Sequence, residues 1–167
     1  MVVNVERSTI SVSELRPRVI DLLARLHCER WIERDIVAKG QWEFGVRPDH
    51  SEAAAFYLEI DGTTHADVQS EYGAYEHPNR WTSEEILAFV EAVCEGRIVE
   101  ISLQTSTGRR VLTATTVSTG SGPIESIRYH LPLALIPLPL YAGTLKTVRR
   151  EFISYQSADK HIPPSTP

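Results

Sequence analysis

The sequence has few of the features that tie a chain to a disulfide scaffold, a secretion route or a membrane. Among its 167 residues there are two cysteines, Cys28 and Cys94, and two isolated cysteines do not make a disulfide framework. The N-terminus lacks the basic start and continuous apolar stretch of a signal peptide. The longest apolar region, residues 131–142, is shorter than a membrane span and holds three prolines. We therefore expect a cytoplasmic protein with two free, buried thiols.

An excess of positive charge is also missing. The chain carries 17 Lys and Arg against 22 Asp and Glu, which gives a formal net charge of −5. Proteins that bind nucleic acid or anionic membranes usually present a basic face. Neither nucleic acid nor a membrane is therefore expected as a partner, whereas a basic protein is electrostatically favoured.

Motifs of metal and catalytic sites are missing as well. No two of the six histidines are closer than 12 residues, so none has the one-turn spacing of a helical zinc site. There is no Gly-x-Ser-x-Gly elbow, and the glycine-rich run 120–123 lacks the lysine of a phosphate-binding loop. We predict no catalytic residue, no metal and no cofactor, and the chain is not expected to be an enzyme.

Two segments do have the pattern of amphipathic helices. The first begins near Ser11 or Ser13, and its apolar stripe comprises Leu15, Val19, Leu22, Leu23 and Leu26. The second begins at Thr82, which forms a capping box with Glu85, and ends at Gly96, which can take a positive φ. The apolar face of this second helix comprises Ile86, Phe89, Val90 and Val93.

The rest of the chain alternates in the manner of strands joined by short turns. Strands are predicted at residues 31–38, 41–46, 55–60, 63–70, 99–104, 111–118 and 124–131. Residues 145–155 fit either a helix or a strand. Short turns favour antiparallel pairing, so we predict an α+β fold whose mainly antiparallel sheet, a meander plus a hairpin, is packed by two or three helices. One domain is expected over residues 1–157, followed by a flexible tail over 158–167.

One stretch of the chain is a candidate partner-binding surface. The segment 67–81 is an irregular connection rich in acids and large aromatics, and Tyr and Trp are enriched at binding hot spots. The glutamates of the second helix fall on one stripe opposite its apolar face. We predict that both features form a surface for a basic protein, made of Asp67, Glu71, Tyr72, Tyr75, Glu76, Trp81, Glu84, Glu91 and Glu95. The alternatives are a loop pinned to the core by its aromatics and an ordinary solvated helix face.

The order of the elements resembles that of the immunity proteins of bacterial polymorphic toxin systems. The resemblance lies in the segment 81–103, where the run 81–86 (Trp-Thr-Ser-Glu-Glu-Ile) opens a helix and the run 96–100 (Gly-Arg-Ile-Val-Glu) begins a strand. It covers about an eighth of the chain and transfers no functional residue. It implies a cytoplasmic protein that binds a cognate toxin and blocks its active site or its assembly.

Two other functions stay open. One is a secretion-type chaperone that binds an extended segment of another protein on an apolar groove or sheet edge, with residues 131–141 as a candidate patch. An exposed apolar patch and a dimer would favour it. The other is an enzyme or small-ligand binder, and a deep pocket would favour it. The candidate lining residues of such a pocket are Trp31, Trp42, Tyr57 or His65.

Overall fold

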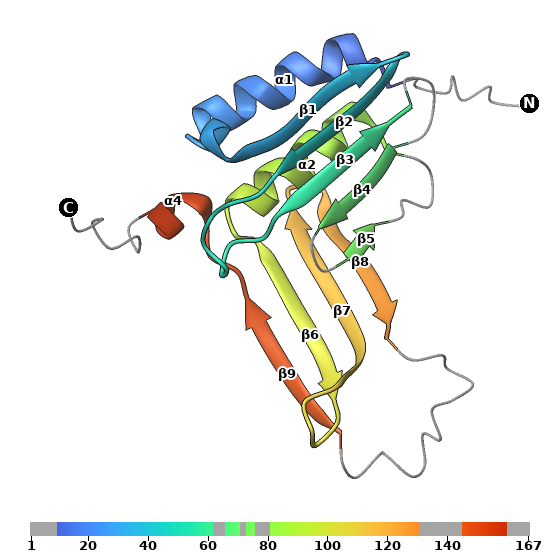
Figure 1. Cartoon of the computed structure of the whole chain (residues 1–167), viewed down its shortest axis with the longest axis vertical. Helices are drawn as coiled ribbons and strands as arrows, with labels where there is room; N and C mark the ends of the chain where they lie inside the picture. Colours follow the sequence, from blue (N-terminus) through green and yellow to red (C-terminus); the bar gives the residue numbers. More distant parts are fainter. Residues whose placement is uncertain (1–9, 62–65, 71–72, 76–80, 131–144, 160–167) are drawn as a thin grey trace, which may run out of the picture.

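The computed structural model describes residues 10–61, 66–70, 73–75, 81–130 and 145–159. They form two antiparallel sheets and three α-helices (Figure 1). The first sheet is a meander of β1 (Ile32–Ala38), β2 (Gln41–Val46), β3 (Phe56–Ile60), β4 (Ala66–Ser70) and β5 (Gly73–Tyr75). The second sheet has the order β8-β7-β6-β9 and comprises β6 (Ile98–Gln104), β7 (Arg110–Thr119), β8 (Gly122–Tyr129) and β9 (Lys146–Glu151). The predicted α+β fold with antiparallel strands is confirmed.

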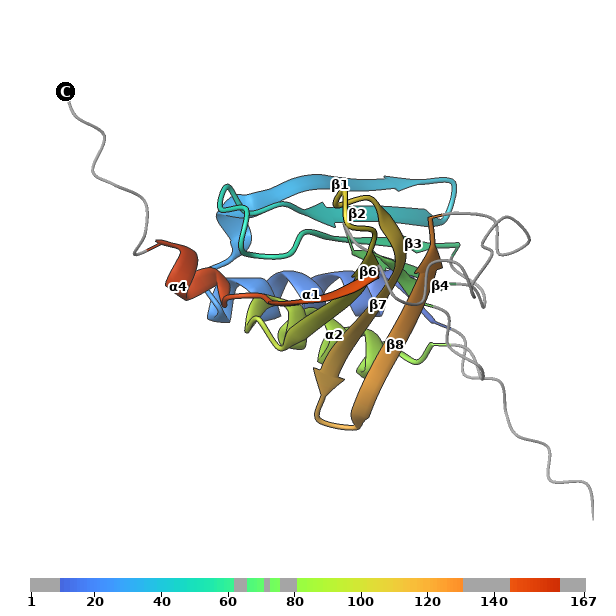
Figure 2. The same cartoon turned by 90° about the horizontal axis from the view of Figure 1, so that it is seen from below.

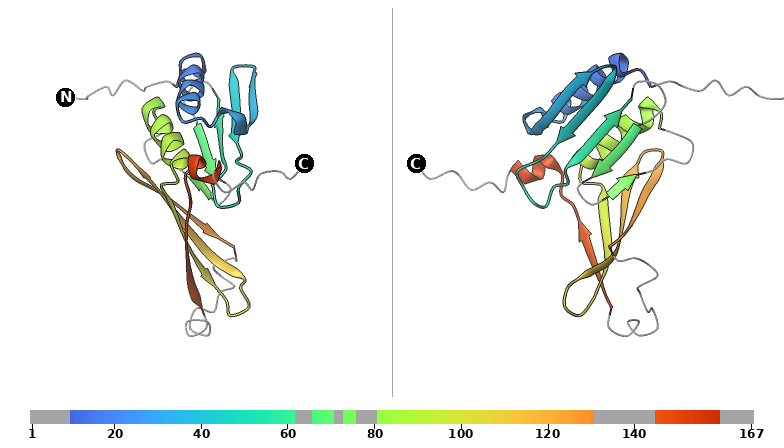
Figure 3. Two further views of the ribbon diagram at one scale, coloured as in Figure 1. Left: turned by 90° about the vertical axis from the view of Figure 1, so that its left-hand side faces the viewer. Right: turned by 45° about the vertical axis from the view of Figure 1, so that its right-hand side comes forward.

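Helices α1 (Val12–Arg25) and α2 (Ser83–Cys94) cover one face of the first sheet, and the second sheet extends away from this body (Figure 3). Seen from below, its strands cross the direction of the first sheet (Figure 2). The buried residues of α1 are four of the five in its predicted stripe: Leu15, Val19, Leu22 and Leu23. Its N-cap is Ser11, one of the two predicted starts. The Ser11 hydroxyl makes no capping hydrogen bond and lies 2.9 Å from the hydroxyl of Ser13.

Helix α2 begins and ends where the sequence predicts. The Thr82 hydroxyl accepts a hydrogen bond from the backbone N–H of Glu85, while the Glu85 carboxylate accepts one from the backbone N–H of Thr82 at 2.8 Å. Gly96 follows the C-cap with φ +72°. The buried face contains the predicted residues Ile86, Phe89, Val90 and Val93.

Replacing Thr82 with alanine tests the contribution of this cap. The substitution leaves the N–H of Glu85 without its side-chain acceptor, and we expect the free energy of unfolding to fall by about 1 kcal/mol. Urea denaturation measures the loss. Thr82→Ser serves as the control, because serine keeps the capping oxygen, and an equal loss in both variants would contradict the capping role.

The core lies between the first sheet and the two helices. Inward-facing residues alternate along β2 and β3, and the fully buried ones include Trp42, Phe44, Phe56, Leu58 and Ile60. The predicted turn between β1 and β2 is formed by Lys39 and Gly40, both with positive φ (+53° and +82°). Two consecutive residues of this kind match the right-handed twist of a hairpin.

Both cysteines are buried and free, as predicted. Cys28 follows the end of α1 and Cys94 is the last residue of α2. Cys28 Sγ donates to the Leu26 carbonyl at 3.2 Å. The interaction between the two thiols lowers the pKa of Cys28 and raises the pKa of Cys94 well above its usual range. They join the ends of the two helices within the core.

The second sheet has an inverted pattern of burial. Along β6, Glu100 and Ser102 are 2 % and 1 % exposed, whereas Ile101 is 40 % exposed. On β7 and β8 the buried residues Thr113, Thr115 and Ser126 are likewise polar, and they lie between the buried valines Val111 and Val117 of β7. The polar face of this sheet is therefore turned inward and its apolar face outward.

The end of the chain resolves an ambiguity of the sequence. Residues 146–151 form strand β9, and a short helix α4 (Tyr155–Asp159) follows. Tyr155 is fully buried, its hydroxyl donates to the Ala54 carbonyl at 2.5 Å, and its ring packs edge-on against Trp31. Helix α4 reaches two residues into the predicted tail, and the remainder of that tail lies outside the described residues.

Other departures from prediction are small. Strand β5 was not predicted, because only three residues pair there. The predicted strands at 63–70 and 124–131 are β4 and β8, with 63–65 and 131 outside the described residues.

Within the described part of the chain, no helix combines the length and apolar character needed to cross a membrane.

Candidate protein-binding surface

The predicted partner-binding residues of the segment 67–81 separate into three groups. Asp67 lies on β4 opposite Glu59, and Tyr75 lies on β5 opposite Val68. Trp81 is a core residue, 4 % exposed, with its ring 5.9 Å from that of Phe89. The remaining aromatic and acidic positions of that segment, Glu71, Tyr72 and Glu76, lie outside the described residues. The expectation that Trp81 is an exposed ring is wrong, because Trp81 packs in the core immediately before α2.

The glutamate stripe of α2 faces solvent, opposite the buried Ile86 and Val93, as the helical periodicity predicts. The side chains of Glu84, Glu91 and Glu95 are 75 %, 47 % and 46 % exposed. This stripe is therefore accessible to a partner along the length of the helix.

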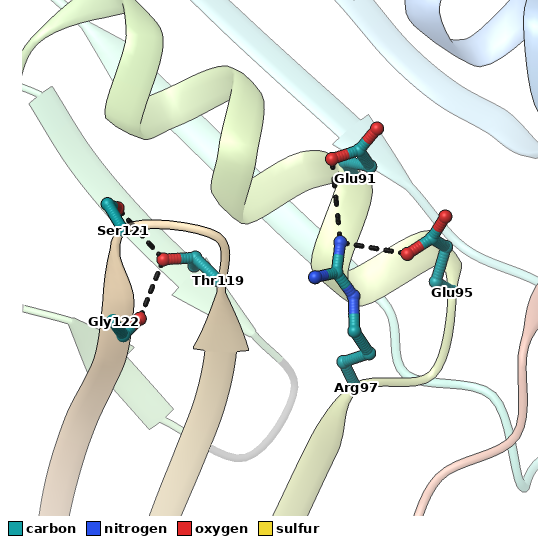
Figure 4. Close-up of polar contacts among 6 residues, drawn as sticks. All are labelled: Glu91, Glu95, Arg97, Thr119, Ser121 and Gly122. Atoms are coloured by element: carbon teal, nitrogen blue, oxygen red, sulfur yellow. Dashed lines mark hydrogen bonds and ion pairs between the residues drawn. The ribbon is translucent and has the colours of Figure 1, made fainter.

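Each of these glutamates has an arginine partner. Arg18 of α1 binds both carboxylate oxygens of Glu84, at 2.8 and 2.9 Å. The Arg97 guanidinium lies between Glu91 and Glu95, at 3.4 and 2.8 Å (Figure 4). These pairs lower the negative potential that three unpaired carboxylates would produce. The sequence pattern does not reveal them, because Arg18 lies 66 residues from Glu84 and Arg97 lies beyond the end of the helix.

Two residues of the stripe, Glu84 and Glu91, line one wall of a groove between α1 and α2. The groove has a volume of about 850 Å³. Its floor is apolar and its rims carry charges of both signs; the lining residues are Arg18, Asp21, Leu22, Ala24, Arg25, Glu84, Leu87, Ala88 and Glu91. A groove of this kind suits a polypeptide segment that presents small apolar side chains flanked by charged ones.

The far end of the stripe adjoins the second sheet. The Arg97 carbonyl accepts a hydrogen bond from the backbone N–H of Ser118 at 2.9 Å. Next to it, the turn between β7 and β8 is closed by Thr119, whose hydroxyl donates to the Gly122 carbonyl at 2.6 Å and lies 3.0 Å from that of Ser121 (Figure 4). Arg97 therefore marks the junction between the helical surface and the second sheet.

The residues sought for a ligand pocket do not line a common one. Trp42 faces the core, whereas Tyr57 lies on the opposite face of the first sheet. There Tyr57 lines a shallow hollow of about 620 Å³ together with Glu33 and Arg47. Trp31 is buried against Tyr155, and His65 lies outside the described residues. Of the described candidates, Tyr57 therefore lines a hollow, whereas Trp31 and Trp42 are core residues.

The hollow at Tyr57 is held by a charged cluster. Arg47 Nε donates to the Glu33 carboxylate at 3.1 Å, and the Tyr57 hydroxyl donates to the same carboxylate at 3.2 Å. Arg47 holds the pKa of Glu33 below its usual range, and burial raises the pKa of Tyr57. The hydrogen bonds to Glu33 hold Arg47 and Tyr57 in place on the outer face of the first sheet.

Comparison with protein-family models, with curated proteins and with solved structures finds no match to this chain.

Proposed function

We propose that this chain is a cytoplasmic protein-binding module, an immunity protein that neutralises a basic toxin domain by binding it directly. The observation that supports the proposal is the groove between α1 and α2, whose α2 wall carries Glu84 and Glu91 above an apolar floor. A toxin segment with lysines or arginines around an apolar contact would match this arrangement.

The arginine partners are compatible with such binding. Arg18 and Glu84 are 46 % and 75 % exposed, and exposed ion pairs typically contribute less than about 1 kcal/mol. A carboxylate can also accept more than one hydrogen bond, so an incoming basic side chain can share Glu84 with Arg18. The net charge of −5 attracts a basic protein at longer range.

Charge reversal tests the groove. The partner to test is any toxin-like protein encoded by a gene adjacent to that of this chain. Its dissociation constant is measured by calorimetry with the wild type and with the triple variant Glu84→Lys, Glu91→Lys, Glu95→Lys. We expect affinity to fall by about 100-fold or more, since like charges would then face each other. Growth rescue on co-expression with the toxin should fail in parallel.

The matched control carries the same change in net charge away from the groove. Glu29→Lys, Asp49→Lys, Glu52→Lys replaces three exposed acidic residues that lie outside the stripe and outside the segment 67–81. It should retain nearly all of the affinity. Equal losses in the two triple variants would show a nonspecific charge effect, and unchanged binding in the first would contradict the proposal.

A secretion-type chaperone is the second candidate, and the outward apolar face of the second sheet favours it. The two functions differ in the state of the bound protein. An immunity protein binds a folded toxin, whereas a chaperone holds an extended segment of its client. Hydrogen exchange of the bound partner separates them, because a folded domain retains protected amides and an extended segment does not.

A further inference from the structure

The two cysteines form a buried pair that has no part in the proposed function. Cys28 and Cys94 are 1 % and 3 % exposed and belong to the same core cluster. Neither sulfur lines the groove between α1 and α2. Chemistry at this pair is therefore separable from partner binding.

The register of the two helices brings the cysteines together. Arg18 binds Glu84, which lies 66 residues further along the chain. Each α2 residue that lines the groove follows an α1 lining residue by the same 66 positions, so the two helices are parallel and aligned. Cys94 also follows Cys28 by 66 positions. The two cysteines therefore stand at matching ends of the helix pair.

A turn at the end of α1 directs Cys28 into the core. The N–H of Cys28 donates to the Leu23 carbonyl at 2.8 Å, and the N–H of His27 donates to the Ala24 carbonyl at 3.0 Å. Together with φ +55° at His27, these hydrogen bonds make a Schellman motif. The motif fixes the backbone that carries the Cys28 sulfur, so Cys28 is buried although His27 and Glu29 on either side are exposed.

The ionisation of the neighbouring groups agrees with contact between the sulfurs. The interaction with Cys94 lowers the pKa of Cys28. Burial, and then the charges of Cys94 and Cys28, raise the pKa of Tyr155 well above its usual range. The Tyr155 hydroxyl therefore lies near both sulfurs. Because Tyr155 begins α4, this last described helix packs against the pair.

We propose that Cys28 and Cys94 are a redox-sensitive pair, which small-molecule disulfides such as oxidised glutathione convert to an intramolecular disulfide between the ends of α1 and α2. The Cys28 thiolate attacks one sulfur of oxidised glutathione, whose S–S bond breaks and releases one reduced glutathione. The Cys94 sulfur then attacks the Cys28 sulfur of this mixed disulfide and releases the second. The protein loses two protons and two electrons, and one oxidised glutathione becomes two reduced ones.

Cys28 makes the first attack because the thiolate is the nucleophile, and the lower pKa of Cys28 gives it the larger thiolate fraction. Both sulfurs are buried, so glutathione reaches them only after a local opening. The five-residue helix α4 is the element to open, since short elements near the end of a chain separate at least cost. We therefore expect oxidation to take minutes to hours. Under reducing conditions the pair stays as two free thiols, as in the structure.

The experiment equilibrates the purified full chain with mixtures of oxidised and reduced glutathione, in buffer and in concentrated urea, and reads the products by mass spectrometry after acid quenching. The mass of the native chain should fall by about 2 Da, since two hydrogens are lost. The effective concentration of the two thiols should be about 100-fold higher or more in buffer than in urea, because the fold holds together two groups that a long loop separates in the unfolded chain. The same ratio predicts that oxidation raises the melting temperature by about 5–10 °C.

Cys94→Ala is the matched control. Cys28 then has no second thiol to react with, so this variant should stop at the mixed disulfide and gain the mass of one glutathione. The comparison between buffer and urea uses the wild-type chain alone, so it does not depend on how the variant folds.

Three results would overturn the proposal: a native wild type that stays reduced, a native wild type that only gains glutathione, or an effective concentration in buffer no higher than in urea. Each would identify Cys28 and Cys94 as packing residues of the core. None of them bears on partner binding at the α1–α2 groove.

Discussion

Replacing Gly96 with alanine is expected to lower the free energy of unfolding by about 3 kcal/mol. Gly96 has φ +72°, a conformation that costs a residue with a Cβ about 1 kcal/mol. A Cβ at this position would also lie 2.4 Å from the backbone carbon of Ile153 and 2.5 Å from the nitrogen of Ser154. Both are backbone atoms, so the segment between β9 and α4 would have to move.

Gly40→Ala is the matched control for this prediction. Gly40 has φ +82°, but no atom lies within 4 Å of the position its Cβ would take. We expect a loss of about 1 kcal/mol there, from the backbone conformation alone. Urea denaturation of both variants gives the difference, and equal losses would show that the approach of Ile153 to Gly96 is without energetic effect.

Replacing Asp35 with alanine is expected to destabilise the fold by about 3 kcal/mol. The Asp35 carboxylate accepts two hydrogen bonds from Arg16, at 2.9 and 2.6 Å, and one from the indole N–H of Trp42, at 2.9 Å. Trp42 is fully buried, so alanine leaves its N–H without an acceptor away from water. The same change releases α1 from β1, because Arg16 and Asp35 join these two elements.

Asparagine at position 35 separates the acceptor from the charge. Asp35→Asn keeps an oxygen for Trp42 and loses the ionic bond to Arg16, so it should cost less than Asp35→Ala. The hydrogen bonds from Arg16 hold the pKa of Asp35 below its usual range. The ionised carboxylate therefore stabilises the fold fully above its unfolded pKa of about 3.9, and this contribution disappears as the pH falls through the lower folded value.

The measurement is the difference in unfolding free energy between wild type and Asp35→Asn as a function of pH. It should be constant from pH 7 to about pH 5 and shrink as the pH falls below about 4. If the difference in unfolding free energy between wild type and Asp35→Asn increased as the pH fell, the stabilising role of the ionised Asp35 carboxylate would be contradicted.

Local sequence signals were sufficient for much of the fold. The second helix is predictable because its cap, its apolar face and its terminating glycine all agree, and each depends on neighbours within a few residues. The first meander is predictable because a large apolar residue recurs at every second position of β2 (Trp42, Phe44, Val46) and β3 (Phe56, Leu58, Ile60), and because Lys39-Gly40 forms the β1–β2 turn.

The orientation of the second sheet was not predictable from alternation alone. Period 2 separates Ile101 from Glu100 but does not say which of them faces inward. The structure decides this through Ile98, which enters the core one residue after Arg97 and directly opposite Val117. Every second residue after Ile98 is then directed inward, whatever its polarity.

The candidate surface was predictable only as far as one helix determines it. Periodicity correctly placed Glu84 and Glu91 on the solvent side of α2. It could not supply the second wall of the groove, which comes from α1, or the pairing of Glu84 with Arg18. Trp81 was predicted on the binding surface but lies in the core, because the sequence pattern of an aromatic residue before a helix is the same in both cases.

The position of Tyr155 has a consequence for the order of folding during synthesis. Its hydroxyl binds the Ala54 carbonyl across 101 residues of sequence, and its ring covers Trp31. Contacts of such separation form late, because a long loop must close first. Until Tyr155 has been synthesised, Trp31 and the Ala54 carbonyl lack these contacts, so we expect the N-terminal meander to complete its packing only after β9 has been made.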